Sequence, residues 1–243
     1  MKRWRSVVVL GLVCLPALAI LVGLGVWQLQ RLAWKEALIA EVSARAGAAP
    51  VAPPPEAEWA SLMPESTEYR HVRVSGVYDL AHQALVFRAL ANPRGRYGGQ
   101  GTLVLTPLKL ADGATIIVNR GFVPLERKDA ANVAPPAPAE VAGLMRASEP
   151  RNLFTPADDP ARGAWYTRDP AAIAAAFGLT RVAPFTIDAD AAPDPAALPE
   201  GGETILAFPN NHFEYALTWF GLGIALAGVF AAYAFSVARQ ARE

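Results

Sequence analysis

The sequence predicts a membrane protein of the α+β class, in which two transmembrane helices bracket an exported, mainly antiparallel β domain. Residues 6–30 carry no charged side chain, and residues 215–238 carry none either. As a helix, each segment would be about 36 Å long, which exceeds the roughly 30 Å hydrocarbon core of a bilayer. Between them lies a series of short alternating or β-branched runs, which are typical of strands.

The predicted boundaries follow from the charges. We expect a cytoplasmic N-terminus at 1–5, transmembrane helices at 6–29 and 214–237, an exported domain at 30–213, and a cytoplasmic C-terminus at 238–243. The basic residues at the outer ends are Lys2, Arg3, Arg5, Arg239 and Arg242. Because basic flanks favour the cytoplasmic side, both termini are expected there and the domain in the periplasm.

The first apolar segment could instead be a cleaved signal peptide. Ala17-Leu-Ala19 resembles a cleavage site, but the apolar run continues to Trp27, which a secretory signal does not need. Retention of both helices is therefore favoured. No Ser-rich, acid-poor transit peptide precedes the first segment, so we expect a bacterial inner membrane rather than a mitochondrial one.

Composition excludes several classes of function. The chain has 22 basic and 22 acidic residues, so nothing suggests a nucleic-acid interface. Its one cysteine, Cys14, lies inside the first apolar segment, which leaves the exported part without disulfides or thiolate metal sites. We also find no Gly-x-Ser-x-Gly elbow, Walker loop or His-Glu-x-x-His sequence, so we expect no enzyme.

The middle of the chain reads as a helical stalk followed by a sheet. Residues 31–45 keep helical spacing, 46–55 are rich in Ala and Pro, and 59–63 suggest a short helical turn. The predicted strands are 71–78, 84–90, 102–106, 115–119, 141–145, 185–187 and 204–208. Asp112-Gly113 predicts a hairpin, and Pro170–Phe177 a helix that Gly178 ends. The sheet is expected to curl toward a barrel.

Two further segments are predicted to be loops. Gly98-Gly-Gln-Gly101 precedes a strand rather than a helix, which makes it a turn and not a phosphate site. The acidic pair Asp158-Asp159 is flanked by prolines and is expected in a solvated loop. No coiled-coil repeat is evident.

His212 is the most informative titratable residue, because it directly precedes the second apolar segment. At a membrane interface an imidazole can anchor a helix end, form a hydrogen bond, or ligate haem iron. From its position alone these alternatives stay open, with anchoring or hydrogen bonding favoured. Gln28 and Gln30 could bond to Asn211 or His212 if the helices pack together.

Small residues in the second apolar segment indicate helix packing. Gly221, Ala225 and Gly228 would allow close approach of either the first helix or a partner.

Five segments resemble the surfeit-locus family of cytochrome c oxidase assembly proteins. They are Gly25–Ile39 (GVWQLQRLAWKEALI), Leu105–Leu108 (LTPL), Val118–Pro124 (VNRGFVP), Trp165–Asp169 (WYTRD) and Asn210–Phe220 (NNHFEYALTWF). Their order and the two-span frame agree with the family. Phe122 stands where we expect Trp, and Asp158 stands where the family often has Asn.

The resemblance implies an assembly factor that carries haem a to subunit I of cytochrome c oxidase, with haem a synthase as a second partner. It makes His212 the candidate axial ligand. Trp219 could pack against the macrocycle, although packing between helices is favoured. Arg31 or Arg120 could pair with propionates, although for Arg120 a structural role within the sheet is favoured.

Three other functions were weighed. A cofactor-free scaffold would bind subunit I without haem. An enzyme acting on haem or quinone lacks acid/base groups around His212, and a sensor would need a cytoplasmic output module that the short predicted ends do not provide.

Overall fold

A computed structural model describes residues 2–149 and 151–240, with side chains from Trp4 onward. The side chains of Lys2 and Arg3, and the whole of Arg242, therefore lie outside the described part. The chain divides into a helical unit, made by residues up to 41 and from 207 on, and a β domain of residues 42–206.

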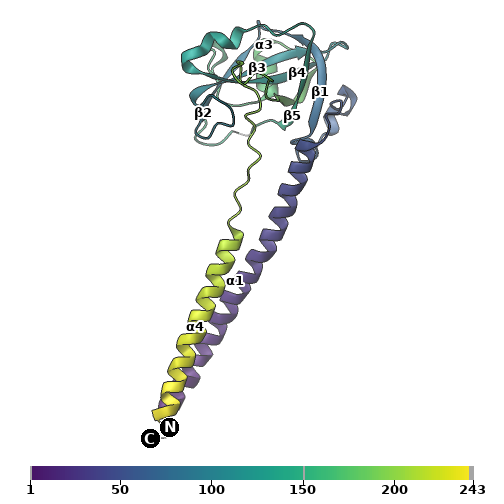
Figure 1. Ribbon diagram of the computed structural model, residues 1–243. Helices are drawn as coiled ribbons and strands as arrows, with labels where there is room; N and C mark the ends of the chain where they lie inside the picture. Colours follow the sequence, from purple (N-terminus) through teal and green to yellow (C-terminus); the bar gives the residue numbers. More distant parts are fainter. Residues whose placement is uncertain (1, 150, 241–243) are drawn as a thin grey trace. The chain divides into compact units, whose positions relative to one another are not determined.

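Two long helices make up the helical unit: α1, Lys2–Gly47, whose last turns enter the β domain, and α4, His212–Gln240. They lie side by side (Figure 1). By length and composition both are apolar enough to cross a membrane. They extend beyond the predicted spans 6–29 and 214–237, whose limits remain predictions. The stalk predicted at residues 31–45 is confirmed as part of α1.

The two helices meet along a seam whose spacing alternates between three and four residues. On α1 the less exposed positions include Gly11, Cys14, Leu18, Leu21, Gly25, Gln28 and Leu32, and on α4 they include His212, Ala216, Trp219, Gly223, Leu226 and Phe230. This is the spacing of a left-handed coiled coil. The sequence conceals it because the remaining positions of both helices are equally apolar.

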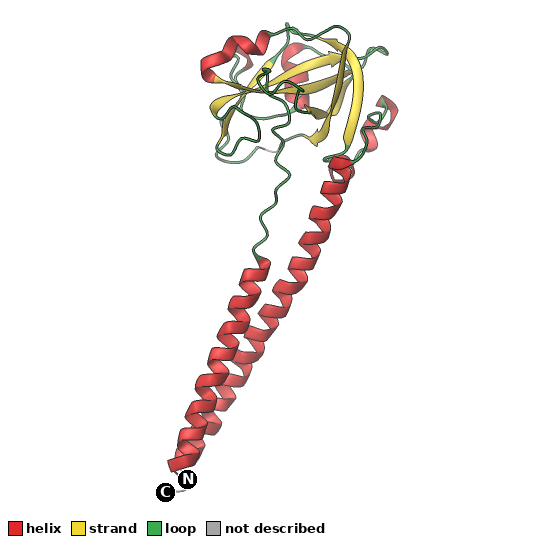
Figure 2. Cartoon of the chain, in the orientation of Figure 1, coloured by secondary structure: helices red, strands yellow, loops and turns green. Residues whose placement is uncertain are grey.

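The β domain is built on one six-stranded sheet, drawn in yellow in Figure 2. In chain order its strands are β1 (His71–Tyr78), β2 (Ala84–Leu90), β3 (Gly99–Lys109), β4 (Thr115–Pro124), β5 (Ala139–Ala147) and β6 (Val182–Ala189). The strand order is β1-β5-β6-β4-β3-β2, and an additional pairing of β1 with β3 closes the sheet into a barrel. The predicted barrel is confirmed.

Strand directions agree with the prediction except at one pair, because β4 and β6 run parallel. The β3–β4 hairpin turns at Gly113, which has φ +84° and needs no Cβ. Closure depends on Gly76: a Cβ there would lie 2.5 Å from the carbonyl oxygen of Lys109. A side chain at this position would therefore separate β1 from β3.

The barrel interior holds the largest core, which includes Val72, Leu108, Ile116, Val118, Met145, Phe185 and Ile187. A second core lies around Phe122, Trp165 and Ile173, and it includes the helix α3, Pro170–Phe177. Asp169 caps α3 by accepting from the N–H groups of Ala171 and Ala172, and Gly178 ends it at φ +64°. The predicted helix is confirmed residue for residue.

Short helical turns complete the domain: η1 (Glu56–Ser61), α2 (Pro64–Thr67), η2 (Leu125–Asn132) and η3 (Pro160–Arg162). The first of these is the turn predicted at 59–63, displaced by a few residues.

The predicted strand at 204–208 is wrong. Pairing in this part of the chain ends at Gly202, whose N–H donates to the carbonyl of Ala189. The hydroxyl of Thr204 then donates to the carboxylate of Asp188 at 2.7 Å. The β-branched side chain that suggested a strand therefore serves a polar contact, and the segment continues toward α4 without regular structure.

Strand β3 is longer than predicted at both ends. It begins at Gly99, inside the predicted turn, because Gly99 pairs with Leu90. It also includes Pro107, which lies between the pairing with β2, ending at Leu105, and the pairing with β1, starting at Leu108. A proline is tolerated in this gap, since no neighbouring strand needs its missing N–H.

Candidate functional site

The candidate site in the helical unit is formed where α4 begins. His212 is the first residue of α4, and its Nδ1 lies 2.6 Å from Oε1 of Gln28 on α1. His212 is half-buried, and Gln28 is 9% exposed. The structure thus brings together the histidine and one of the two glutamines that the sequence singled out.

This hydrogen bond fixes the tautomer of the imidazole. An amide oxygen only accepts hydrogen bonds, so Nδ1 of His212 carries the proton and donates to Gln28. In the neutral ring Nε2 then keeps its lone pair. Among the described residues none makes a hydrogen bond with Nε2, so it is free to coordinate a metal.

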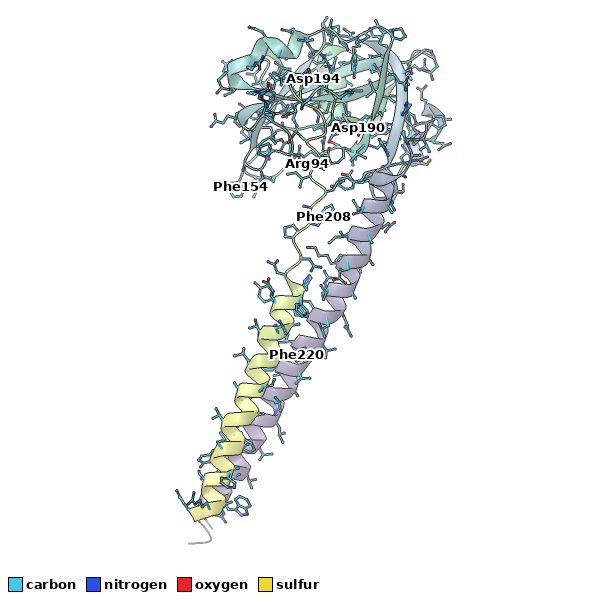
Figure 3. All side chains as sticks on the ribbon, in the orientation of Figure 1. Arg94, Phe154, Asp190, Asp194, Phe208 and Phe220 are labelled. Carbon is cyan, nitrogen blue, oxygen red and sulfur yellow. The ribbon has the colours of Figure 1, made fainter. Side chains whose placement is uncertain are left out.

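Glycines along the seam bring the two helices close enough for this contact. A Cβ on Gly25 would lie 2.5 Å from the ring of Phe220, which is labelled in Figure 3. A Cβ on Gly223 would lie 3.4 Å from Cδ1 of Leu18. By contrast, a Cβ on Gly221 or on Gly228 would meet no atom of another described element within 4 Å. The sequence left either the first helix or a partner protein as the neighbour of these small residues. At Gly221 and Gly228 the first helix is not that neighbour.

Trp219 follows His212 by seven residues, which places it on the same face of α4 about 10 Å further along the helix. It is half-buried in the seam, as the prediction of helix packing requires. Its Nε1 is buried without a hydrogen-bond partner among the described residues, and so is Oδ1 of Asn210. Both residues belong to the Asn210–Phe220 segment.

Arg31 lies on α1 one turn beyond Gln28 and is exposed. Its guanidinium stacks on the ring of Trp34, with 4.3 Å between Cζ and the ring centroid. A nearby cation, Lys35, donates to the carbonyl of Pro209. The structure therefore provides an accessible positive charge on α1 close in sequence to Gln28.

Arg120 has the structural role that the sequence favoured. It is 9% exposed and donates from Nη1 to the carbonyl of Ala131 at 3.3 Å and from Nη2 to that of Val133. Its guanidinium also lies 5.4 Å from the ring centroid of Tyr78. Burial raises the pKa of Tyr78 to about 12 although the charge of Arg120 opposes this, so the phenol stays neutral. Arg120 thus fastens η2 to the barrel.

A buried charge network in the β domain was not anticipated. Asp188 on β6 is 6% exposed and accepts hydrogen bonds from the side chains of Arg168 (3.0 Å), Arg146 (3.3 Å), Asn119 (3.0 Å) and Thr204 (2.7 Å). Burial alone would raise the pKa of Asp188, but the two guanidinium groups and the hydrogen bonds outweigh it. The pKa therefore lies below its ordinary value.

The network borders a cavity of about 230 Å³, lined by Arg88, Asn119, Arg146, Glu149, Arg168, Asp188 and Thr204 together with Leu90, Leu103 and Ile205. Arg88 pairs with Glu149 at 2.7 Å, and Arg146 pairs with Glu68 at 2.7 Å as well as with Asp188, while Glu203 accepts hydrogen bonds from backbone N–H groups. This arrangement joins several strands and the segment 200–204, so we assign it to stability. Of the network residues, Asn119 lies within Val118–Pro124 and Arg168 within Trp165–Asp169, two of the segments that sequence reasoning had marked, although neither residue was given a role there.

The prediction of a solvated loop at Asp158-Asp159 is wrong for Asp158. Its side chain is 9% exposed and accepts from the backbone N–H of Tyr166 at 2.6 Å and from Oγ1 of Thr167 at 3.0 Å. Burial raises the pKa of Asp158, but these hydrogen bonds and the charge of Arg151 outweigh burial. The pKa therefore lies below its ordinary value and the carboxylate stays ionised. Flanking prolines misled the prediction because they do not determine where a side chain points.

The chain is similar to proteins of a known family. Residues 15–224 match the model of the SURF1 family. The chain is 36% identical to Surfeit locus protein 1 of Mus musculus over 87% of this chain and 70% of the relative. It is 35% identical to that of Homo sapiens (84% and 70%) and 36% identical to the SURF1-like protein of Drosophila melanogaster (84% and 70%). The chain therefore belongs to the SURF1 family, whose members are cytochrome oxidase assembly factors and not enzymes.

Proposed function

We propose that this chain carries haem a and passes it to subunit I of cytochrome c oxidase during assembly. The observation that supports this most directly is the hydrogen bond from His212 to Gln28, which in the neutral ring leaves the lone pair of Nε2 available; no described residue makes a hydrogen bond with that nitrogen. A carrier needs one preoriented ligand that can release its cargo. A single histidine held by a neutral amide meets that need.

The residues present suit haem a. When bound, haem a would supply an iron that accepts a nitrogen ligand, and an apolar tail that belongs in lipid. His212 would hold the iron through Nε2, and Gln28 would keep the ring in the required tautomer and orientation. Arg31 would pair with a propionate, and Trp219 would line the seam below the ligand.

We further propose that α1 and α4 span the inner membrane of a bacterium, with both termini in the cytoplasm and the β domain in the periplasm. The support is the apolar character of both helices and their largely exposed surfaces, which lipid would cover. Arg5 and Arg239 lie at the outer ends of these helices, as the positive-inside rule requires. Haem a synthase would supply the ligand within the same membrane.

The test is a pyridine haemochrome spectrum of protein produced together with the haem a pathway. We expect haem a in the wild type and its loss in His212→Ala. His82→Ala is the matched control, because its imidazole lies in the β domain and bonds to Asp79 at 3.0 Å. Haem retained in His212→Ala would move the ligand elsewhere.

The alternative is a cofactor-free scaffold. Wild-type protein that co-purifies with subunit I but contains no haem would contradict the carrier proposal and leave this function.

A further inference from the structure

The β domain displays two large apolar side chains that no other part of it covers. Leu153 is 100% exposed and Phe154 is 94% exposed. Both lie in the loop between β5 and η3, and Phe154 points away from the body of the domain (Figure 3). A folded domain gains nothing from such exposure, so a ligand or surface that covers the pair is the physical expectation.

The loop holds this display in place. Nη2 of Arg151 bonds to the Asp158 carboxylate at 2.5 Å, and Nη1 bonds to the carbonyl of Pro156 at 3.0 Å. The side chain of Asn152 accepts from the N–H of Phe154 at 2.8 Å. Asp158 in turn accepts from the backbone N–H of Tyr166 and from the hydroxyl of Thr167. These bonds hold the loop in one conformation, so little conformational entropy is lost when it binds.

The size and charge of the tip favour lipid over a protein partner. A phenylalanine buries about 200 Å², so two side chains fall well short of the ~800 Å² per partner that a stable protein interface needs. Insertion into a bilayer needs no such area and is favourable for each apolar side chain buried. The carboxylate of Asp158 is turned inward and neutralised by Arg151, so its charge does not oppose approach to a membrane.

Connectivity supports the same occupant. The β domain is joined to α1 at one end, and at the other end only residues 205–211 separate the buried Thr204 from the start of α4. Seven residues span at most about 25 Å. If both helices span the membrane, Thr204 therefore lies no more than about 25 Å from the start of α4, so the domain stays within reach of the lipid surface.

We propose that Leu153 and Phe154 form a membrane anchor, which inserts into the interfacial region of the bilayer that holds α1 and α4. This inference rests on the proposed spanning of the membrane but not on haem binding. The anchor would limit rotation of the β domain about its two tethers.

The test uses full-length protein with one cysteine. In a Cys14→Ser background, Leu153→Cys carries an NBD fluorophore and is reconstituted in vesicles of phosphatidylethanolamine and phosphatidylglycerol, with or without doxyl-labelled phosphatidylcholine. Ile224→Cys, on the exposed face of α4, is the positive control. Arg162→Cys, whose native side chain is 86% exposed in the β domain, is the negative control.

We expect blue-shifted emission and doxyl quenching at positions 153 and 224 but not at 162. Adding Phe154→Asp should abolish the quenching at 153, which shows that the apolar tip and not the fluorophore inserts. Quenching at 224 without quenching at 153, or equal quenching at 153 and 162, would overturn the anchor. Absence of quenching at 224 as well would overturn the proposed spans on which the anchor rests.

Discussion

At the scale of single residues, the side-chain amide of Gln28 decides which nitrogen of His212 carries the proton. Without the bond to Gln28, either nitrogen of His212 could carry the proton and the ring could rotate. With this bond, Nδ1 donates to Gln28 and the lone pair of the neutral ring lies on Nε2. Gln30, only two residues away, is exposed and makes no such contact among the described residues.

Gln28→Leu should weaken haem a retention by about 10- to 100-fold, the usual cost of losing a partner that orients a metal ligand. Gln28→Glu keeps an acceptor and should restore most of it. The measurement is haem a per protein from the pyridine haemochrome after graded washing. Gln30→Leu is the matched control and should behave as wild type; an equal loss in that variant would mean that the region, and not the hydrogen bond, is responsible.

Asp188→Asn should destabilise the β domain by about 3–5 kcal/mol, because it leaves the buried guanidinium of Arg168 without its counter-charge and leaves Arg146 with Glu68 alone. The measurement is urea unfolding of the detergent-solubilised chain, followed by near-ultraviolet circular dichroism. Glu140→Gln is the control: its pair with Arg73 is more than half exposed on both sides, so a change below about 1 kcal/mol is expected. Similar losses in both variants would argue against a special role for the buried network.

At the scale of elements, the seam between α1 and α4 sets the register of the site. Gly25 receives the ring of Phe220 one turn before Gln28, and Gly223 receives Leu18 further along. Such contacts are available only to residues without a side chain, so a shift of one helix along the other would lose them. The same register places His212 opposite Gln28.

The seam predicts a specific cross-link. A Cβ on Gly223 would lie 3.9 Å from Cβ of Leu21, which is close to the separation found in disulfides. Leu21→Cys with Gly223→Cys, in a Cys14→Ser background, should therefore form an intramolecular disulfide under mild oxidation, seen as a mobility shift without reductant. Leu21→Cys with Gly228→Cys should not form a disulfide, since a Cβ on Gly228 would meet no atom of another described element within 4 Å. The opposite result would require a different register.

At the scale of the whole molecule, the free energy of unfolding is expected to decrease at low pH. The pKa values of Asp188, Asp158 and Glu149 all lie below their ordinary values in the folded chain. Burial opposes this in each case, and hydrogen bonds together with neighbouring arginines outweigh burial. A carboxylate with a lowered folded pKa stabilises the fold above its unfolded pKa of about 4. That stabilisation is lost as the pH falls through the folded pKa.

We therefore expect the urea midpoint of the β domain to fall as the pH is lowered below about 4, with little carboxylate-driven change between pH 6 and pH 8. Asp188→Asn should flatten this acid dependence while lowering the midpoint at neutral pH. A wild-type midpoint that rises on acidification would contradict the assignment of these carboxylates as ionised, stabilising groups.

The sequence by itself determined the elements whose signals are local. The two long apolar helices, the strands 71–78 and 84–90, the 112–113 hairpin and the capped helix 170–177 follow from charge, periodicity and turn chemistry within a few residues. His212 could also be singled out from the sequence, because it directly precedes an apolar segment that is long enough to span a membrane. These features need only neighbours in the chain.

Tertiary structure alone decided what depends on distant residues. The pairing of β1 with β3 closes the barrel, and four donors spread from residue 119 to residue 204 converge on Asp188. The segment 204–208 has the composition of a strand, but Thr204 bonds to the Asp188 carboxylate and the segment forms no strand. No local pattern encodes such convergence, because a buried charge is stable only where the fold brings its partners together.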